Sequence, residues 1–415
     1  MRDPRRQNRA ARRRARRLGR SLAPRKGVLA VLSASAALLL PGLAKAQEER
    51  WTIDYGYSHY SEDPVDKSKV EVGSPDRYEI DTHQIALKGP ITGRMDVGLN
   101  VVTETMTGSS PWYIEPDANN KPVVVMTGAS ISDARTDVSG HGTYYFDTSR
   151  LNLQGGYSTE DDYQSMSFGL GSEHDFNEKN TTLSWGAGMS FDTIDPTPTT
   201  ANPNPDTHDK RSISLFAGWS QVLGRSSALQ TAFSYTNGSG FLSDPYKLVS
   251  IGGVNVADNR PDQRNQYALL LRYRRFFESV TGTLHLDYRY YYDDWKLSSH
   301  TVELAWYQSL FDVVTVTPSV RYYTQSQADF YGPYFSSVPG DYASSDYRLS
   351  PYGALSGKVR LEMHIADWPF HMAWKLGGSY ERYYSSGAFA IQHVGLENPA
   401  LVNFNVFMID ISARF

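Results

Sequence analysis

The stretch from Arg264 to Leu310 limits the fold more than any other part of the chain, because three consecutive segments within it alternate strictly. In the second segment, apolar or aromatic residues at even positions alternate with mostly charged residues at odd positions: Leu284, Leu286, Tyr288 and Tyr290 against His285, Asp287, Arg289 and Tyr291. Successive side chains of a strand point to opposite faces, so the pattern predicts strands with one apolar and one charged face. Such strands suit a barrel wall with lipid outside and water inside.

The same alternation recurs along the chain and predicts sixteen strands in all. Besides the three above, they cover or begin near 51–60, 77–88, Met95, 135–146, 150–159, Met166, 183–191, 210–222, 227–236, 313–325, 346–363, 370–384 and 401–415. Seven short turns alternate with eight other connections, of which six are long and two are tight. This asymmetry is typical of outer-membrane barrels. The predicted fold class is therefore all-β: a transmembrane antiparallel up-and-down β-barrel of about 16 strands, with 14 or 18 as alternatives.

Two of the long connections are candidate plugs of the lumen. They lie near 107–134 and 237–263, and the first contains the apolar run Val123–Met126. An apolar run favours burial over exposure to water. Because a sixteen-stranded barrel leaves an aqueous lumen unless something fills it, the fate of these loops decides whether the barrel is open.

The first 46 residues have the layout of a secretory signal peptide. An arginine-rich lead precedes an apolar run, 27–40, and the small-residue site Ala44-Lys45-Ala46 follows. The apolar run is shorter than the roughly 20 residues that a membrane-spanning helix needs. We expect cleavage after Ala46, which divides the chain into a signal peptide, 1–46, and an outer-membrane barrel, 47–415. The lead is longer than usual, which a start codon assigned too far upstream explains.

Charge and cysteine content exclude several function classes. The first 46 residues hold 13 of the 41 basic residues and one of the 45 acidic residues, so the remaining chain carries 28 basic and 44 acidic residues, a net charge of −16. A chain this acidic is a poor ligand for nucleic acid, so no nucleic-acid partner is expected. The absence of cysteine excludes a disulfide framework and a thiolate metal site.

The C-terminus and the aromatic residues point to the outer membrane. In MIDISARF, apolar residues alternate up to the final Phe415, a pattern that resembles the signal read by the outer-membrane assembly machinery. That machinery is therefore an expected partner, together with the lipids and lipopolysaccharide of a Gram-negative outer membrane. Aromatic residues at strand ends are interpreted as girdles at the membrane interfaces: Tyr55, Tyr145, Tyr290, Trp306 and Trp374.

Charged residues on the polar face of the C-terminal strands are the candidates for setting solute selectivity. They are Arg272, Arg274, Arg289, Arg321, Arg360, Lys375, Asp287, Glu303 and Glu381. Opposed rows of arginine and carboxylate set a transverse field in a channel and select ions. The alternative is that these residues pair across neighbouring strands and fill a narrow barrel with salt bridges.

Two tight tips are candidates for a cation site at the rim. Each carries two acids beside an aromatic residue: Asp161-Asp162-Tyr163 and Asp293-Asp294-Trp295. Carboxylate oxygens suit Ca²⁺ or Mg²⁺. Turn acids that are simply solvated explain the same pattern.

No enzyme and no cofactor is expected. The sequence has no nucleophile elbow, no H-E-x-x-H and no phosphate-binding glycine loop. Ser299-His300 is an adjacent nucleophile-like pair, but neighbours on a strand point to opposite faces. His285 and Asp287 share a face, which a lumen charge ladder explains as well as catalysis. A triad assembled across strands stays invisible in spacing, so a barrel hydrolase is disfavoured without being excluded.

Several motifs together resemble a domain-of-unknown-function family of Gram-negative outer-membrane proteins. They occur in order along the chain: YSTEDDY (157–163), SDPYK (243–247), RYRRFF (272–277), LDYRYYYDDW (286–295), SSHTVELAWYQ (298–308) and QADFY (327–331). The resemblance implies a barrel in the outer membrane and implies no activity or catalytic residue. It also implies association with small periplasmic lipoproteins and with periplasmic redox or flavin-attachment proteins.

These observations favour a porin-like channel for passive diffusion of small polar solutes. The alternative is a non-conducting barrel that serves as a structural or assembly component of a surface transport or redox complex. The sequence leaves open whether copies associate into a homo-oligomer.

Overall fold

The computed structural model describes residues 50–127, 131–198, 205–311, 313–365 and 372–415. The predicted signal peptide, 1–46, lies outside the described residues. Within these ranges, no helix has both the length and the apolar character needed to cross a bilayer. The described helices are single 3-10 turns: η1 (Lys67–Lys69), η2 (Glu278–Val280), η3 (Tyr347–Leu349) and η4 (Gly387–Phe389).

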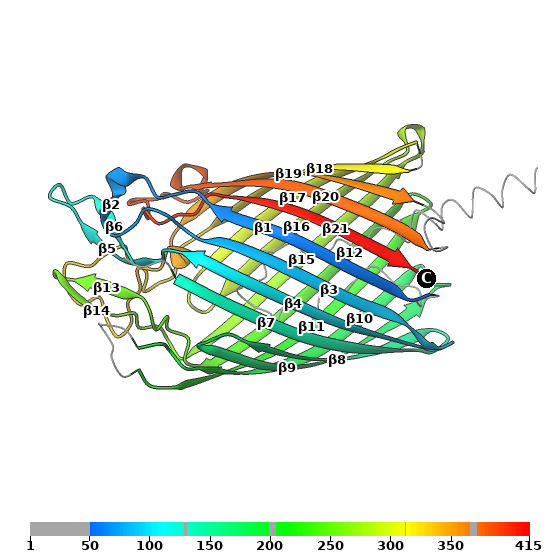
Figure 1. The fold of residues 1–415 in the computed structure, drawn as a ribbon, viewed down its shortest axis with the longest axis horizontal. Coiled ribbons are helices and arrows are strands. Elements are labelled where there is room, and N and C mark those ends of the chain that lie inside the picture. The colour runs from blue at the N-terminus through cyan, green and yellow to red at the C-terminus, as the bar shows by residue number, and fades with distance from the viewer. Residues whose placement is uncertain (1–49, 128–130, 199–204, 312, 366–371) are drawn as a thin grey trace, which may run out of the picture.

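Sixteen antiparallel strands close into a barrel, which confirms the predicted fold (Figure 1). They are β1 (Thr52–Glu62), β3 (Glu79–Thr92), β4 (Met95–Gly108), β7 (Ile131–Tyr145), β8 (Ser149–Thr159), β9 (Tyr163–Phe176), β10 (Thr181–Ile194), β11 (His208–Gly224), β12 (Ser227–Gly240), β15 (Gln263–Phe277), β16 (Gly282–Asp293), β17 (Ser298–Leu310), β18 (Val314–Gln325), β19 (Tyr352–Ile365), β20 (Ala373–Ser386) and β21 (Phe404–Arg414). Strand β1 pairs with β21 over its whole length, from Thr52 with Arg414 to Glu62 with Phe404, and this pairing closes the wall.

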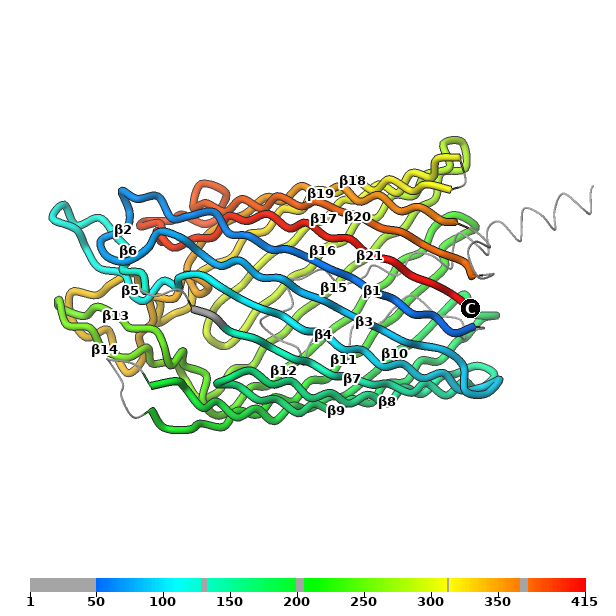
Figure 2. The backbone as a smooth tube through the Cα atoms, viewed as in Figure 1, coloured from blue at the N-terminus to red at the C-terminus, as the bar shows by residue number. Residues whose placement is uncertain are grey.

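The two ends of the barrel differ. Strand β1 begins and β21 ends at the same end, where neighbouring strands are joined by short turns (Figure 2). We call this the turn end, and the opposite one the loop end. Short turns on one side and longer loops on the other are what outer-membrane barrels show.

Each barrel strand turns one set of alternate residues outward and the other set toward the lumen. On β16, Leu286 and Tyr292 are exposed, whereas His285 and Asp293 are buried. Large apolar side chains are also exposed on the outward set of other strands, such as Leu269 on β15 and Ile409 on β21. A bilayer requires an apolar outer band and paired backbone groups, and a closed barrel meets both needs.

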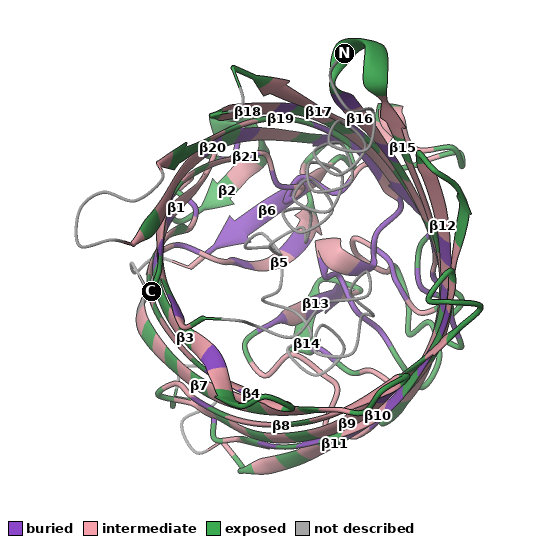
Figure 3. Cartoon of the chain, turned by 90° about the vertical axis from the view of Figure 1, so that its right-hand side faces the viewer, coloured by how far each residue is buried: buried purple, intermediate pink, exposed green. Residues whose placement is uncertain are grey.

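Connections at the loop end fold together over the barrel mouth. We call them the cap, which comprises 63–78, 109–127, 241–262, 294–297, 326–351 and 387–403. It contains a three-stranded sheet of β2 (Val70–Val72), β6 (Pro122–Met126) and β5 (Pro111–Pro116), and a hairpin of β13 (Leu248–Ile251) and β14 (Val254–Ala257). These strands lie beyond the ends of the barrel strands in Figure 1 and project inside the ring in Figure 3.

Two hydrophobic clusters hold the cap together. The first consists of buried side chains from the β16–β17 and β18–β19 connections: Trp295, Leu297, Ala328, Tyr331 and Leu349. The second joins four residues of the β1–β3, β4–β7 and β20–β21 connections: Val65, Val124, Met126 and Ala400. We call the part of the barrel enclosed by the sixteen strands the shaft. Among the described residues, the buried apolar clusters therefore belong to the cap and not to the shaft.

Some sequence expectations need correction. The strand expected at 346–363 begins at Tyr352, because Asp346 caps η3 by accepting a hydrogen bond from the backbone N–H of Arg348, 3.0 Å away. Tyr145, expected in an aromatic girdle, faces the lumen and donates to Asp96 at 3.0 Å. Its neighbour Tyr144 takes the outward position, and successive residues must alternate.

The candidate plugs form secondary structure that the sequence did not reveal. The connection 107–134 contains β5 and β6, and 237–263 contains β13 and β14. The run Val123–Met126 is buried, as expected. It lies across the mouth rather than inside the shaft (Figure 1).

Candidate functional site

All nine charged residues proposed for the lumen lie on the inward set of the strands. The backbone register shows this, because directly paired residues share a face. Arg272 pairs with Asp287, Asp287 with Glu303, and Glu303 with Arg321, so one row of charges crosses β15, β16, β17 and β18. Lys358 pairs with Glu381 between β19 and β20. We call this inward surface of β15–β21 the charged wall.

Most charges of the charged wall are paired with each other. Asp287 Oδ2 lies 3.5 Å from Arg272 Nε and accepts a hydrogen bond from Arg274 Nη2 at 3.0 Å. Arg321 Nε lies 3.0 Å from Glu303 Oε2. These charges therefore pair across neighbouring strands, and several of the pairs remain partly exposed.

A second group of pairs lies on β19, β20 and β21. Arg360 is 3.0 Å from Glu362 and 2.8 Å from Asp410. Lys375 also pairs with Glu362, and Lys358 lies 3.8 Å from Glu381. Lys358, Glu362 and Asp410 were not singled out from the sequence, although strand parity places them with the others.

Arg289 differs from its neighbours on the charged wall. Its side chain is exposed, and among the described residues no carboxylate lies within salt-bridge distance of it. Its guanidinium carbon lies 5.8 Å from the ring centroid of Tyr291. Tyr291 in turn packs against the cap cluster that contains Trp295, so Arg289 faces the lumen just beneath the cap.

The opposite side of the lumen has another character. Figure 3 places β3, β4 and β7 across the ring from β15 and β16. From β4 to β11, the described inward residues include more acids than bases: Asp96, Glu104, Asp133, Asp137, Glu173, Asp175 and Asp192 against Arg135, Arg150 and Lys210. The lumen thus has an acidic side and a basic side.

Next to the charged wall, and overlapping the acidic side at β10 and β11, the inward surface of β10, β11 and β12 carries mainly small residues. They include Ser184, Gly186, Gly188, Ser190, Ser212, Ser214, Gly218, Ala228, Ala232 and Ser234. We call this surface the small-residue wall. Small side chains occupy little of the lumen, so the width of the shaft is set mainly by the long side chains of the charged wall.

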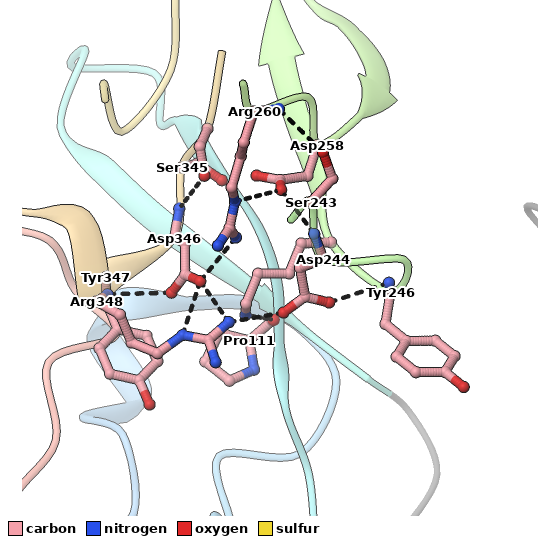
Figure 4. A network of polar contacts seen from close by, with 12 residues as sticks. Pro111, Ser243, Asp244, Tyr246, Asp258, Arg260, Ser345, Asp346, Tyr347 and Arg348 are labelled. Atoms are coloured by element: carbon pink, nitrogen blue, oxygen red, sulfur yellow. Dashed lines mark hydrogen bonds and ion pairs between the residues drawn. The ribbon is translucent and has the colours of Figure 1, made fainter. Parts of the chain in front are cut away.

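A buried ionic network occupies the centre of the cap (Figure 4). The carboxylate of Asp346 is fully buried and lies 2.9 Å from Arg260 Nη2 and 2.7 Å from Arg348 Nε. Arg260 also binds Asp258 at 2.7 Å, and Arg348 binds Asp244 at 2.7 Å. The five residues come from two connections, β12–β15 and β18–β19, which are held together through one carboxylate.

Charge balance makes this network stable despite its burial. Burial alone would raise the pKa of Asp346, but the adjacent Arg348, Lys247 and Arg260 hold that pKa well below its usual range. Burial lowers the pKa of Lys247 and raises that of Asp258. Three cations thus face three carboxylates, and a buried charge needs such compensation.

Other connections attach to the same network. Lys247 Nζ donates a hydrogen bond to the carbonyl oxygen of Pro111 at 2.9 Å, which ties in the β4–β7 connection. Lys247 and Arg77 lie over the ring of Tyr347, at 5.8 and 5.4 Å from its centroid. Asn398 of the β20–β21 connection donates to the carbonyl oxygen of Ser345 at 3.2 Å. Five connections are therefore interlocked around Asp346 and Tyr347.

The acids predicted to bind a cation at the rim lie in two different environments. Asp293 is buried, pairs with Arg264 Nη2 at 2.6 Å and accepts a hydrogen bond from the backbone of Leu297. Asp294 accepts a hydrogen bond from the backbone N–H of Asn265 at 3.0 Å. These contacts engage both carboxylates in holding the β16–β17 tip.

The other rim tip brings carboxylates together. Oxygen atoms of Asp133, Glu160 and Asp162 lie within 4.8 Å of one another, while Asp161 is exposed. Asp162 also accepts a hydrogen bond from Tyr246. Burial and the charge of Asp133 raise the pKa of Glu160 to about 7. A cation site at this tip stays a prediction.

The hydrolase candidates do not meet. Ser299 pairs with Tyr291, whereas His285 pairs with Ala305, six residues further along β17, so the two side chains are about 20 Å apart at about 3.4 Å per residue. His300 faces outward and bonds to the Tyr288 hydroxyl at 2.8 Å. The Nε2 atom of His285 is buried and has no hydrogen-bond partner among the residues that the structure describes.

Sequence reasoning missed the cap network. Its residues lie in two irregular connections, where no periodicity tells which side chains are buried. The signal available was the charge content of SDPYK (243–247) and of the segment 341–348, both of which stand in proline- and glycine-rich loops. Charged residues there ordinarily indicate a solvated surface.

Comparison with solved structures finds other barrels at low identity. A bacterial polysaccharide outer membrane secretin superposes with a TM-score of 0.45 at 10% identity, covering 89% of this chain and 100% of that chain. OccK2 (OpdF) of Pseudomonas aeruginosa, in complex with glucuronate, gives a TM-score of 0.41 at 10% identity, covering 88% and 98%. For the siderophore receptor PirA of Pseudomonas aeruginosa, the values are 0.41 and 10%, covering 82% of this chain and 57% of the receptor. The likeness concerns the barrel fold alone.

Comparison by sequence identifies the family. No curated protein matches the chain. The family model described as "Protein of unknown function (DUF3570)" matches residues 29–405, which is most of the chain. The protein therefore belongs to the DUF3570 family.

Proposed function

We propose that the protein is an outer-membrane channel through which small polar solutes diffuse passively. The observation that supports this proposal is the distribution of side chains inside the barrel. The buried apolar clusters of the described residues belong to the cap, whereas the shaft presents charged side chains on one side and small ones on another. A sixteen-stranded barrel with a polar inner face encloses water.

The lumen charges define how the channel would select solutes. The strands of the charged wall lie across the ring from the strands that carry the acidic side (Figure 3). A low-dielectric wall focuses the field between the two sides. A polar solute would be oriented by this field as it passes. The cap limits access at the loop end, so only small solutes or those admitted by cap movement would enter.

The absence of cysteine allows a sharp test. Single cysteines at Thr301, which faces the lumen, and at Val302, which faces outward and is 38% exposed, are matched neighbours on β17. In a planar bilayer, we expect steady ohmic conductance steps, and a charged, membrane-impermeant thiol reagent should reduce them for Thr301→Cys but not for Val302→Cys. If the protein is folded, as heat-modifiable gel mobility would show, and gives no conductance steps, the channel proposal is wrong.

The cap favours a second candidate, a non-conducting barrel that serves as a component of a surface assembly. Five connections interlocked through a desolvated ionic network form a firm lid. If the mouth never opens, no conductance occurs, and the lumen cysteine should then react without any electrical signal. The same pair of variants therefore separates the two functions.

A further inference from the structure

We propose that Arg289 and Arg272 form a binding site for the anionic group of a small solute, a carboxylate or a phosphate, in the lumen beneath the cap. The inference deepens the proposed channel, because a solute would reach the site through the shaft. It rests on the charge distribution of the charged wall, on the geometry of Arg289 and on the groups that surround it.

The positive charge of the charged wall exceeds its negative charge, and the excess is localised. The described inward residues of β15–β21 include nine cations and six carboxylates: Arg264, Arg272, Arg274, Arg289, Arg321, Lys358, Arg360, Lys375 and Arg414 against Asp287, Asp293, Glu303, Glu362, Glu381 and Asp410. Arg414 lies at the turn end. The rest of the excess falls on the adjacent strands β15 and β16. Arg272 and Arg274 share Asp287, and among the described residues no carboxylate lies within salt-bridge distance of Arg289.

The register brings these two excess charges together. Arg272 pairs directly with Asp287, and Arg289 is the next inward residue after Asp287 on β16. Arg272 and Arg289 are thus diagonal neighbours, with Cα atoms about 7–8 Å apart. Two long side chains at that separation can both reach one oxyanion, Arg272 while it keeps its contacts with Asp287 and Gln230.

The surroundings suit an anion better than another cation. Thr301 pairs directly with Arg289 across β16 and β17 and adds a hydroxyl on the same face. The guanidinium of Arg289 lies beside the ring of Tyr291, whose hydroxyl is already engaged with Asp293 at 2.7 Å. A planar guanidinium that is exposed and free of carboxylates offers a bidentate fork to carboxylate or phosphate oxygens.

Binding of inorganic phosphate to the folded protein in detergent tests the site directly. Calorimetric titration at low ionic strength should detect binding, since salt screens exposed charges. Arg289→Gln should weaken it about fivefold or more, the effect of losing one modest charge interaction. Arg289→Lys, which keeps the charge and loses the fork, should give an intermediate loss. Arg321→Gln, which removes the same charge from the same wall, should change the affinity by less than about twofold.

Each outcome decides for or against the site. An unchanged phosphate affinity in Arg289→Gln overturns the site. An equal loss of affinity in Arg321→Gln also overturns it, because that result assigns binding to the charged wall as a whole. The fate of the channel is read separately from the bilayer conductance. Phosphate binding that depends on Arg289 in a silent barrel keeps the site and removes the channel, whereas conductance without phosphate binding keeps the channel and removes the site.

Discussion

The cap and the charged wall are both built on arginine–carboxylate pairs, yet they use them in opposite ways. In the cap, the side chains of Arg260 and Asp346 are 9% and 0% exposed, and the charges balance. On the charged wall, those of Arg321 and Glu303 are 32% and 36% exposed, and positive charge is in excess. Burial makes a charge pair obligatory for structure, because each partner left alone is costly, whereas exposure to the lumen leaves the charge available to a solute.

The largest effect is expected when the cap loses its central carboxylate. Asp346→Ala leaves three cations, Arg260, Arg348 and Lys247, with only Asp258 and Asp244 to compensate them. Removing one partner of a buried ion pair costs about 3–5 kcal/mol. We expect the cap segments 241–262 and 326–351 to become sensitive to limited proteolysis and to exchange amide hydrogens quickly, while the barrel keeps its heat-modifiable mobility. If the channel exists, its conductance should rise as well.

Glu303→Ala is the matched control for that experiment. It removes a carboxylate from an Arg pair on the charged wall, where the remaining Arg321 is partly solvated. Proteolysis of the cap should then match that of the wild type. Equal protection of the cap in Asp346→Ala and in Glu303→Ala would contradict the distinction between the two regions.

The next largest effect is expected in the hydrophobic part of the cap. Trp295 is 4% exposed, donates a hydrogen bond to the carbonyl oxygen of Gln263 at 2.9 Å and lies beneath the guanidinium of Arg264. Trp295→Ala removes this packing, at a cost of about 3 kcal/mol. Hydrogen exchange should increase around 294–297 and 326–331, with less change near Asp346. A cap that loosens everywhere would show that the cluster and the ionic network form one cooperative unit.

A smaller effect on stability is expected when pH changes the charge of Glu160 at the rim. This residue lies outside both the cap and the charged wall. The pKa of Glu160 is raised from 4.5 to about 7 by burial and by the charge of Asp133. Because a raised carboxyl pKa favours the protonated form in the folded state, the stability it contributes is complete below 4.5 and is lost as pH rises through about 7. Hydrogen exchange at 160–162, corrected for its intrinsic pH dependence, should report a looser tip at high pH. Glu160→Gln should abolish that trend, and a trend that persists in the variant would assign it to another group.

The sequence predicted the barrel well and the cap poorly, for a physical reason. In the shaft, each residue has two environments that alternate with period two, so Arg289 and Leu286 reveal their faces by position alone. In the cap, burial depends on contacts between connections far apart in the chain, such as Lys247 with Pro111 or Asn398 with Ser345. Strand parity also failed to show which lumen charges are neutralised. Arg289 and Arg321 follow the same pattern, yet of these two only Arg321 has a carboxylate partner within the described part of the chain.

The smallest effect on stability, and the sharpest contrast with Asp346, is expected for Arg321→Ala. A partly exposed pair contributes about 0–1 kcal/mol, so the free energy of unfolding measured in urea should hardly change. The loss of one lumen cation should nevertheless shift the reversal potential in a salt gradient toward greater cation permeability, because the uncompensated Glu303 remains beside the path. A variant that is strongly destabilised would show that the charged wall packs as tightly as the cap. A variant that leaves both stability and reversal potential unchanged would place Arg321 outside the path of the ions, and the search for selectivity would then centre on Arg289.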